Sequence, residues 1–207
     1  NQAVEFDLRF LKRRDLGENM VYRNYDLDIF QLSESFLEEA PVKFKSIEEP
    51  HFHYSPSVLA TADKALSAGF LKKPKNIFIQ GYWQSPKYFQ EHWKEIAPYF
   101  NFKDSVLDND SANYKKLVAD IQTSNSVMIN FRRADFVEND FHGVKDMDYV
   151  KEAISILQKT EQDLRFFIFS DDIEWCKNNV HLENSFIVDH SFKGPKFSHY
   201  LELMKIC

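Results

Sequence analysis

Short apolar runs alternate with helix-like segments along much of this chain, and this alternation limits its possible folds more than any other feature. The runs are typical of strands buried on both faces, and the intervening segments place apolar side chains on one helical face. Strands are expected at residues 76–80, 127–131, 164–169 and 185–188, and helices at residues 87–96, 148–159 and 173–179. Strands that alternate with helices predict an α/β fold with a mostly parallel, doubly wound sheet.

The first part of the chain is less regular. Residues 3–10 alternate apolar and polar side chains, as a half-buried strand does. Residues 25–40 have a helix-like pattern in which Ser33 is a candidate N-cap. Residues 41–56 begin and end with proline and are expected to form an irregular connection. We place the domain boundary near residue 120, before the strand that carries an arginine pair.

Polar groups follow the carboxyl ends of the last expected strands. They are Arg132–Arg133, Asp171–Asp172 and Asp189. In an open parallel sheet, ligands bind outside the carboxyl ends of the strands. The topology therefore predicts that these residues meet at one crevice, although they are far apart in the sequence.

Arg132 and Arg133 are the strongest candidates for binding an anion, because a guanidinium beside a buried strand needs a negatively charged partner. Successive side chains of a strand point to opposite faces, so one arginine can reach a ligand while the other is held inside the protein. A guanidinium binds phosphate through two hydrogen bonds and stays charged, which suits a diphosphate leaving group. The alternative is a structural network in which both arginines pair with carboxylates such as Asp135 and Glu138.

Other polar and aromatic residues have more than one interpretation. Asp135, Glu138 and Asp140 are rival bases for an incoming hydroxyl. The segment 170–172, Ser-Asp-Asp, fits a divalent-cation site, a cap of the next helix through Ser170 or Asp171, or hydrogen bonds to a ribose or base. Trp83 belongs to an aromatic run that can stack on a sugar, and His142 on a loop either contacts an acceptor or is solvated.

Composition narrows the classes of partner and compartment. The formal charge of −6 disfavours a general nucleic-acid binder and favours a small ligand. Cys176 and Cys207 lack a metal-type spacing, which favours a reducing compartment. No apolar run approaches the roughly 20 residues that span a bilayer, and no signal-peptide pattern opens the chain. We expect a cytoplasmic protein, with peripheral association with the inner face of a membrane left open.

Four stretches together resemble motifs of the α-1,2-fucosyltransferase family. They are GYWQSPKYF at 81–89, similar to GY(F/W)QSxxYF; NFRRADFV at 130–137, similar to HxRRGDYV; His142-Gly143 with Asp148-Tyr149, similar to HG…LDYY; and FIFSDDIEW at 167–175, similar to FFSDDxxW. Each motif alone is weak, but their order and spacing are specific. The resemblance extends from about Tyr25 to Cys207.

The resemblance implies an inverting, metal-independent glycosyltransferase of the GT-B type, with two Rossmann-like, doubly wound domains. Residues 1–120 would form the acceptor-side domain, and residues 121–207 the domain that binds the nucleotide sugar. The implied reaction transfers L-fucose from GDP-fucose to a galactose 2-hydroxyl of a glycan. No cofactor, metal or nucleic acid is implied, and the oligomeric state is left open.

The same resemblance assigns roles to individual residues. Arg132 would contact the β-phosphate, Arg133 and Asp135 would support it, and Asp189 is similar to an aspartate that binds guanine. The expected site then has Arg132, Asp135 and Glu138 as catalytic residues; Asn130, Arg132, Arg133, Ser170, Asp171, Asp172 and Asp189 around the nucleotide sugar; and His142 and Trp83 at the acceptor.

The chain departs from the family pattern in ways that keep other functions open. Asn130 stands where the family has histidine, and Ala134 where it has glycine, which restricts the backbone if that turn needs a positive φ. The family's GGLGNQ opening corresponds at most to Asn1-Gln2, with a gap expected before Ala3, and its NSSFSWWGAWL segment lies beyond Cys207, so both domains are expected to be incomplete. The competing hypotheses are a non-catalytic glycan- or nucleotide-binding protein, and a metal-dependent sugar-nucleotide transferase or hydrolase that uses Asp171 and Asp172.

Overall fold

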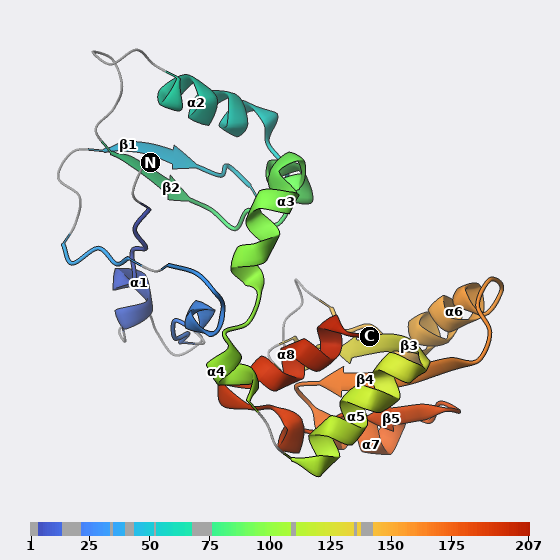
Figure 1. Ribbon diagram of the computed structural model, residues 1–207. Helices are drawn as coiled ribbons and strands as arrows, with labels where there is room; N and C mark the ends of the chain where they lie inside the picture. The colour runs from blue at the N-terminus through green and yellow to red at the C-terminus, as the bar shows by residue number, and fades with distance from the viewer. Residues whose placement is uncertain are drawn as a thin grey trace. The chain divides into compact units, whose positions relative to one another are not determined.

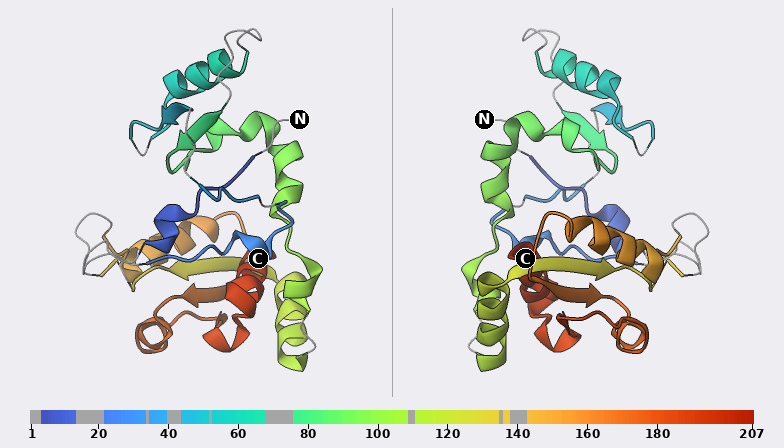
Figure 2. Two further views of the ribbon diagram at one scale, coloured as in Figure 1. Left: turned by 90° about the vertical axis from the view of Figure 1, so that its left-hand side faces the viewer. Right: turned by 90° about the vertical axis from the view of Figure 1, so that its right-hand side faces the viewer.

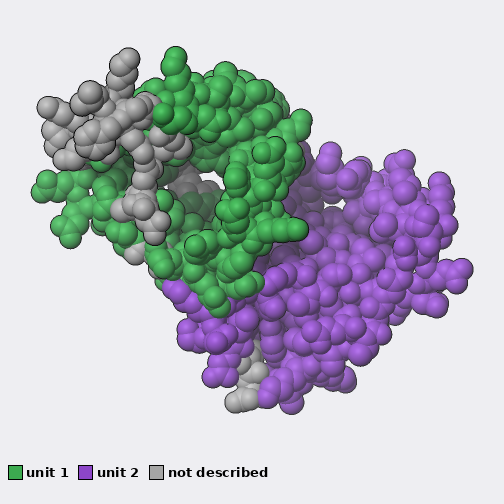
Figure 3. Space-filling model, turned by 45° about the horizontal axis from the view of Figure 1, so that its top comes forward, with its two compact units in different colours: residues 1–101 green, residues 102–207 purple. Residues whose placement is uncertain are grey.

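The chain divides into two compact units, which Figure 3 draws in separate colours. The computed structural model describes residues 4–13, 22–33, 35–39, 44–51, 53–67, 76–108, 111–134, 136–137 and 143–207. Unit 1 comprises residues 1–101 and unit 2 comprises residues 102–207. The boundary expected near residue 120 falls inside helix α5 (Ala112–Thr123), whose buried side chains pack within unit 2.

Unit 2 is built around a parallel sheet. Strands β3 (Asn125–Phe131), β4 (Leu164–Ser170) and β5 (Ser185–Ile187) pair in the order β3-β4-β5 and lie side by side in both views of Figure 2. Helix α6 (Met147–Leu157) connects β3 to β4, and helix α7 (Ile173–Asn179) connects β4 to β5 (Figure 1). These elements confirm the strands and helices expected here, and with them a mixed α/β fold with parallel strands.

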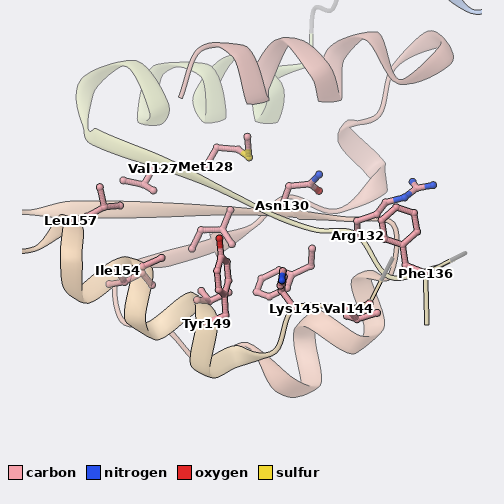
Figure 4. Close-up of a pocket in the computed structure, with 15 residues that line it drawn as sticks. Val127, Met128, Asn130, Arg132, Phe136, Val144, Lys145, Tyr149, Ile154 and Leu157 are labelled. Carbon is pink, nitrogen blue, oxygen red and sulfur yellow. The ribbon is translucent and has the colours of Figure 1, made fainter. Parts of the chain in front are cut away.

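Strand β4 forms the centre of the core because its side chains are buried on both faces of the sheet. Phe167 and Phe169 pack with side chains of α5 and α8 (Ser198–Lys205), and Ile168 packs with those of α6 and α7. Figure 4 shows α5 and α8 on one side of the strands and α6 on the other. All three side chains are fully buried, and burying one such side chain stabilises the folded state by about 1.5–3 kcal/mol.

Unit 1 contains a smaller parallel pair of strands. Strands β1 (Lys45–Glu48) and β2 (Ile77–Gln80) pair in parallel, and Val58 and Ala65 of helix α2 (Pro56–Leu66) pack with Ile47 of β1. The expected strand at 76–80 is confirmed. Strand β1 lies within residues 41–56, which were expected to be irregular, so that prediction is wrong. The prolines that suggested a loop stand outside the strand, and Pro56 begins the helix.

The two helices predicted in unit 1 are shorter than expected. The predicted helix at 87–96 is divided into η2 (Pro86–Tyr88), η3 (Gln90–His92) and α3 (Trp93–Ile96), followed by η4 (Ala97–Phe100). The backbone leaves the helical region at Phe89, where φ is −140°. The predicted helix at 25–40 contains only the turn η1 (Leu27–Ile29) among its described residues.

The strand predicted at residues 3–10 is also wrong. Phe6 makes an isolated bridge to Phe36, and Arg9–Lys12 form the short helix α1. The Asp7 carboxylate accepts hydrogen bonds from the backbone N–H of Arg9, at 3.0 Å, and from its guanidinium. These local bonds favour a turn over an extended chain, and the rings of Phe6, Tyr25 and Phe36 pack on one another.

The remaining helix of unit 2 before the sheet is α4 (Asp104–Leu107), which contacts α8; the Ser198 hydroxyl donates to the carbonyl oxygen of Val106 at 3.0 Å. Within the described ranges of the chain, no helix is both long enough and apolar enough to cross a membrane.

Candidate functional site

The two arginines after β3 have different environments. Strand β3 ends at Phe131, and the side chain of Arg132 is 44% exposed, with Nη1 3.0 Å from Asp171 Oδ2. The Arg133 side chain is only 16% exposed and lies 3.9 Å from the centre of the Trp175 ring. One guanidinium is therefore accessible at the end of the strand, and the other is fixed in the protein.

Asp171 holds the turn that carries both arginines. Its Oδ1 accepts hydrogen bonds from the backbone N–H groups of Arg133, at 2.7 Å, and Ala134, at 3.2 Å. Its other oxygen, Oδ2, forms the ion pair with Arg132. These contacts are possible because β3 and β4 end at the same level: Phe131 is paired with Ser170. A single carboxylate thus fixes both the backbone of the turn and the accessible guanidinium.

Asp172 and Ser170 stabilise the start of α7. Asp172 Oδ1 accepts a hydrogen bond from the backbone N–H of Trp175 at 3.1 Å, so Asp172 is the N-cap, and its Oδ2 lies 3.3 Å from Arg133 Nε. The cap was expected at Ser170 or Asp171, and that expectation is corrected. Ser170 is buried; its hydroxyl donates to the carbonyl of Phe131 at 2.7 Å and accepts from the backbone N–H of Asp172.

Asp189 lies just past β5, at the same edge of the sheet. It caps the turn η5 (His190–Phe192), and its Oδ1 accepts hydrogen bonds from the hydroxyl and the backbone N–H of Ser191. These hydrogen bonds lower the pKa of the Asp189 carboxyl below its ordinary value, so the group is ionised at neutral pH. The Nε2 atom of His190 is 2.9 Å from the carbonyl oxygen of Ser170, which joins this turn to the end of β4.

A mostly apolar cavity of about 450 Å³ lies between β3 and α6 (Figure 4). Arg132 stands at one end of it and Leu157 at the other, and Lys145 lies between them. The remaining lining residues are Val127, Met128, Ile129, Asn130, Phe131, Phe136, Gly143, Val144, Tyr149, Val150, Ala153 and Ile154. Asn130 is exposed, and in Figure 4 its side chain points toward the α5–α8 side of the strand, away from α6.

Trp83 lies in unit 1 and is positioned by a carboxylate that the sequence did not single out. Glu49 Oε2 accepts hydrogen bonds from the backbone N–H groups of Tyr82, at 2.8 Å, and Trp83, at 3.0 Å. These bonds lower the pKa of Glu49. Trp83 has a φ of 51° and packs against Tyr88. A cavity of about 320 Å³ beside it is lined by Glu48, Glu49, Pro50, His51, Gln80, Gly81 and Tyr82.

Three expected site residues, Asp135, Glu138 and His142, lie outside the described residues, as does the rival base Asp140. Of the others, Arg132, Arg133, Ser170, Asp171 and Asp172 lie together where β3 and β4 end, and His190 links Asp189 to them. Within the described part of the chain, no three His, Cys, Asp or Glu side chains are grouped so that they could hold a metal ion.

The arrangement is suited to holding an anion at the edge of the sheet. The Arg132 guanidinium is accessible and permanently charged, and its ion pair with Asp171 holds it in place at this edge. Preorganised donors of this kind stabilise charge that develops on a leaving group.

Comparisons with known proteins point to sugar transfer. A family model described as Glycosyl transferase family 11 matches residues 69–207. An alpha-1,2-colitosyltransferase of Escherichia coli is 38% identical over 101 residues, which are 47% of this chain and 33% of that protein. The O-antigen biosynthesis glycosyltransferase WbnK of Escherichia coli is 30% identical over 117 residues, 53% of this chain and 38% of that protein. The matched region thus spans 33% of the length of the first relative and 38% of that of the second. No solved structure matches the chain.

Proposed function

The chain belongs to glycosyl transferase family 11, and from this premise we propose that it transfers L-fucose from GDP-fucose to the 2-hydroxyl of a galactose in a glycan. The proposed transfer inverts the anomeric centre, needs no metal ion, and takes place in a protein of the GT-B type. The observation that carries the proposal is the accessible Arg132 guanidinium, held by Asp171 at the carboxyl edge of the parallel sheet.

The proposed chemistry is a single displacement. The acceptor oxygen attacks the anomeric carbon from the face opposite GDP and loses its proton to a carboxylate, while the bond between that carbon and the β-phosphate oxygen breaks. Negative charge then grows on the diphosphate. The Arg132 guanidinium can stabilise this charge through two hydrogen bonds, and it does so more strongly in the transition state than in the bound donor.

The remaining assignments belong to the same proposal. Asp135 or Glu138 serves as the base. Asn130, Arg133, Ser170, Asp171 and Asp172 shape the nucleotide-sugar site, and His142 and Trp83 contact the acceptor. Asp189 is suited to guanine because its ionised carboxylate accepts hydrogen bonds, and the Watson–Crick edge of guanine presents N–H donors.

The donor sugar has a second candidate, which the similarity to an alpha-1,2-colitosyltransferase favours. Colitose differs from fucose by the loss of one ring hydroxyl. A site that makes a hydrogen bond to this hydroxyl would reject colitose strongly, whereas a site that only encloses the sugar would accept both. Turnover measured with the GDP derivatives of the two sugars, under the same conditions, separates these cases.

The proposal is tested first by calorimetric titration of the protein with GDP in EDTA, with ADP and UDP for comparison. We expect GDP to bind selectively without a divalent ion. Replacing Arg132 with alanine should weaken GDP binding roughly 10- to 100-fold, because a charge-assisted hydrogen bond is worth about 1.5–3 kcal/mol. Arg132→Lys should restore part of the affinity, since an ammonium keeps the charge but loses the two-point geometry.

Arg165 provides the matched control. It also forms an ion pair in unit 2, 2.6 Å from Asp120, but it lies near the amino end of β4. Arg165→Ala should leave GDP affinity unchanged. Equal binding of GDP and UDP, or a need for a divalent ion, would count against GDP-fucose as donor. Near-normal turnover in Arg132→Ala would show that Arg132 does not stabilise the leaving diphosphate. Selective GDP binding without turnover of any fucosyl donor would favour a non-catalytic nucleotide-binding protein.

A further inference from the structure

The segment between η5 and α8 has an unusual backbone. Lys196 and Phe197 have φ values of 47° and 61°, in the left-handed region that residues with a side chain rarely adopt. Gly194, two residues before Lys196, has a φ of 64°, and a Cβ atom there would collide with the ring of His199. Consecutive left-handed residues cost free energy, and such strain is found preferentially at ligand-binding and catalytic positions.

This backbone brings the Phe197 ring to the surface in a fixed orientation. The residue is 42% exposed, yet its ring makes edge-to-face contacts with His190, at 5.4 Å between centroids, and with Tyr200, at 5.8 Å. His190 and Tyr200 also contact each other. The two supporting rings are themselves held by hydrogen bonds to the main chain at the end of β4. An aromatic ring is thus both accessible and rigidly supported.

The supported ring lies at the same end of the sheet as Arg132. His190 is bonded to the carbonyl of Ser170, and the next residue, Asp171, forms the ion pair with Arg132. The end of β4 therefore has an exposed aromatic ring on the β5 side and an accessible guanidinium on the β3 side. A flat apolar group and an anion, joined by a short spacer, would match these two features. A nucleoside diphosphate has this composition.

We propose that Phe197, supported by His190 and Tyr200, is the surface on which the purine base of the donor nucleotide stacks. The proposal rests on the proposed function, because it takes Arg132 as the diphosphate contact. Every base has a π-face, so the ring contributes affinity, while discrimination between bases falls to hydrogen-bonding groups nearby. The neighbouring Asp189 carboxylate is ionised, and among the described residues no hydrogen bond reaches its Oδ2 atom.

The test compares two ligands, GDP and inorganic pyrophosphate, by calorimetry on the full chain. Pyrophosphate carries the anion without the base. Phe197→Ala should weaken GDP binding on the order of tenfold, which is the size of one base–aromatic stack, and should leave pyrophosphate affinity unchanged. Phe197→Leu keeps an apolar side chain but loses the ring, and should behave as the alanine variant does. Phe197→Trp should retain GDP affinity.

Phe186 provides the control, because it is a similarly exposed phenylalanine of unit 2, 37% exposed, in strand β5. Phe186→Ala should change neither affinity. If GDP affinity is the same in Phe197→Ala and Phe197→Leu as in the wild type, the ring is not a stacking surface and this inference is overturned, while the proposed function stands. A Phe197→Leu variant that binds GDP normally while the alanine variant does not would also overturn it, by showing a packing role. If the wild-type protein binds neither ligand, both proposals fail together.

Discussion

Arg132 and Arg133 are adjacent in sequence but differ in environment, because they meet different carboxylates at the end of β4. Arg133 stacks on Trp175 and meets Asp172, so its charge is neutralised inside the protein. Arg132 meets Asp171 and remains 44% exposed. The carboxylates that receive them are adjacent in sequence, and each also binds backbone N–H groups. The pair is therefore a structural network and an accessible cation at the same time, and the two interpretations open at the sequence level are not exclusive.

The role of Asp171 in holding the turn predicts different effects for two substitutions. In Asp171→Ala, the backbone N–H groups of Arg133 and Ala134 lose their acceptor, which should lower the free energy of unfolding by about 1–3 kcal/mol. Asp171→Asn keeps an oxygen acceptor for these N–H groups, so its free energy of unfolding should fall by less. Urea unfolding followed by circular dichroism measures both. Equal losses in the two variants would show that the negative charge, and not the backbone contact, stabilises the turn.

Residue-level prediction from the sequence was successful where only local geometry was needed. That one arginine is accessible and the other is held in the protein agrees with the alternation of side chains along a strand. The partners of Asp171 cannot be predicted in this way, because they follow another strand and depend on the register that pairs Phe131 with Ser170. The N-cap of α7 was missed by one or two positions for a related reason: Ser170 is drawn into the strand by its bond to Phe131, which leaves Asp172 to cap the helix.

Strands β4 and β5 are joined at their carboxyl ends by a side chain from α8. The Tyr200 hydroxyl donates to the carbonyl oxygen of Val188 at 2.9 Å, lies 3.2 Å from that of Ser170, and accepts from the backbone N–H of Ser170 at 2.9 Å. Burial raises the pKa of Tyr200 to about 12. This hydroxyl provides hydrogen-bond partners for main-chain groups that lie past the regular ladder of the sheet.

Tyr200→Phe should lower the free energy of unfolding by about 1–3 kcal/mol, because the buried main-chain groups lose a partner. The effect should also depend on pH. The folded-state pKa is raised above the unfolded value of about 10, so the contribution of the neutral phenol is full below pH 10 and is lost as pH rises toward 12. Urea unfolding at pH 8 and at pH 11 tests both effects.

The control for this prediction is Tyr149→Phe, because Tyr149 is 56% exposed on α6. It should unfold like the wild type at both pH values. If Tyr200→Phe is as stable as the wild type at pH 8, the hydroxyl does not join the strand ends. If it loses as much stability as the wild type between pH 8 and pH 11, Tyr200 is not the group whose ionisation matters.

Sequence patterns predicted the elements of unit 2 better than those of unit 1. Strands β3, β4 and β5 each contain a short apolar run bounded by polar residues, and such runs have few alternative structures. In unit 1, apolar periodicity over residues 25–40 reflects rings such as Tyr25 and Phe36 that pack on Phe6, not one face of a helix. Short, irregular segments held by aromatic contacts carry no period, so pattern analysis cannot locate them.

At the scale of the whole molecule, the described residues proposed to contact the nucleotide sugar all belong to unit 2. This unit has its own sheet and its own core clusters on both faces of that sheet. Trp83, proposed to contact the acceptor, belongs to unit 1, which has a separate small core around Ile47. The expected GT-B architecture remains a proposal, since what is observed is a parallel α/β arrangement in each unit.

The separate core of unit 2 predicts that residues 102–207 fold without unit 1. Expressed alone, this segment should show a cooperative thermal transition, and the same GDP affinity as the whole chain if GDP contacts unit 2 alone. Differential scanning calorimetry and GDP titration measure the two properties. A segment 112–207, which lacks α4 and the hydrogen bond from Ser198 to Val106, should melt at a lower temperature. A segment 102–207 without a cooperative transition would show that unit 2 needs unit 1 to fold.

The arginine turn, its carboxylates and the Phe197 ring all lie in one contiguous stretch of chain, residues 102–207. This arrangement has a consequence for how such proteins diversify. On the proposed function, a gene could exchange the segment that encodes residues 1–101 and alter the acceptor contacts around Trp83 while inheriting the donor contacts unchanged. Substitutions that alter the donor would instead accumulate after residue 101. Variation among descendants of one ancestor should then be unevenly distributed along the chain, with the two halves recording separate histories of selection.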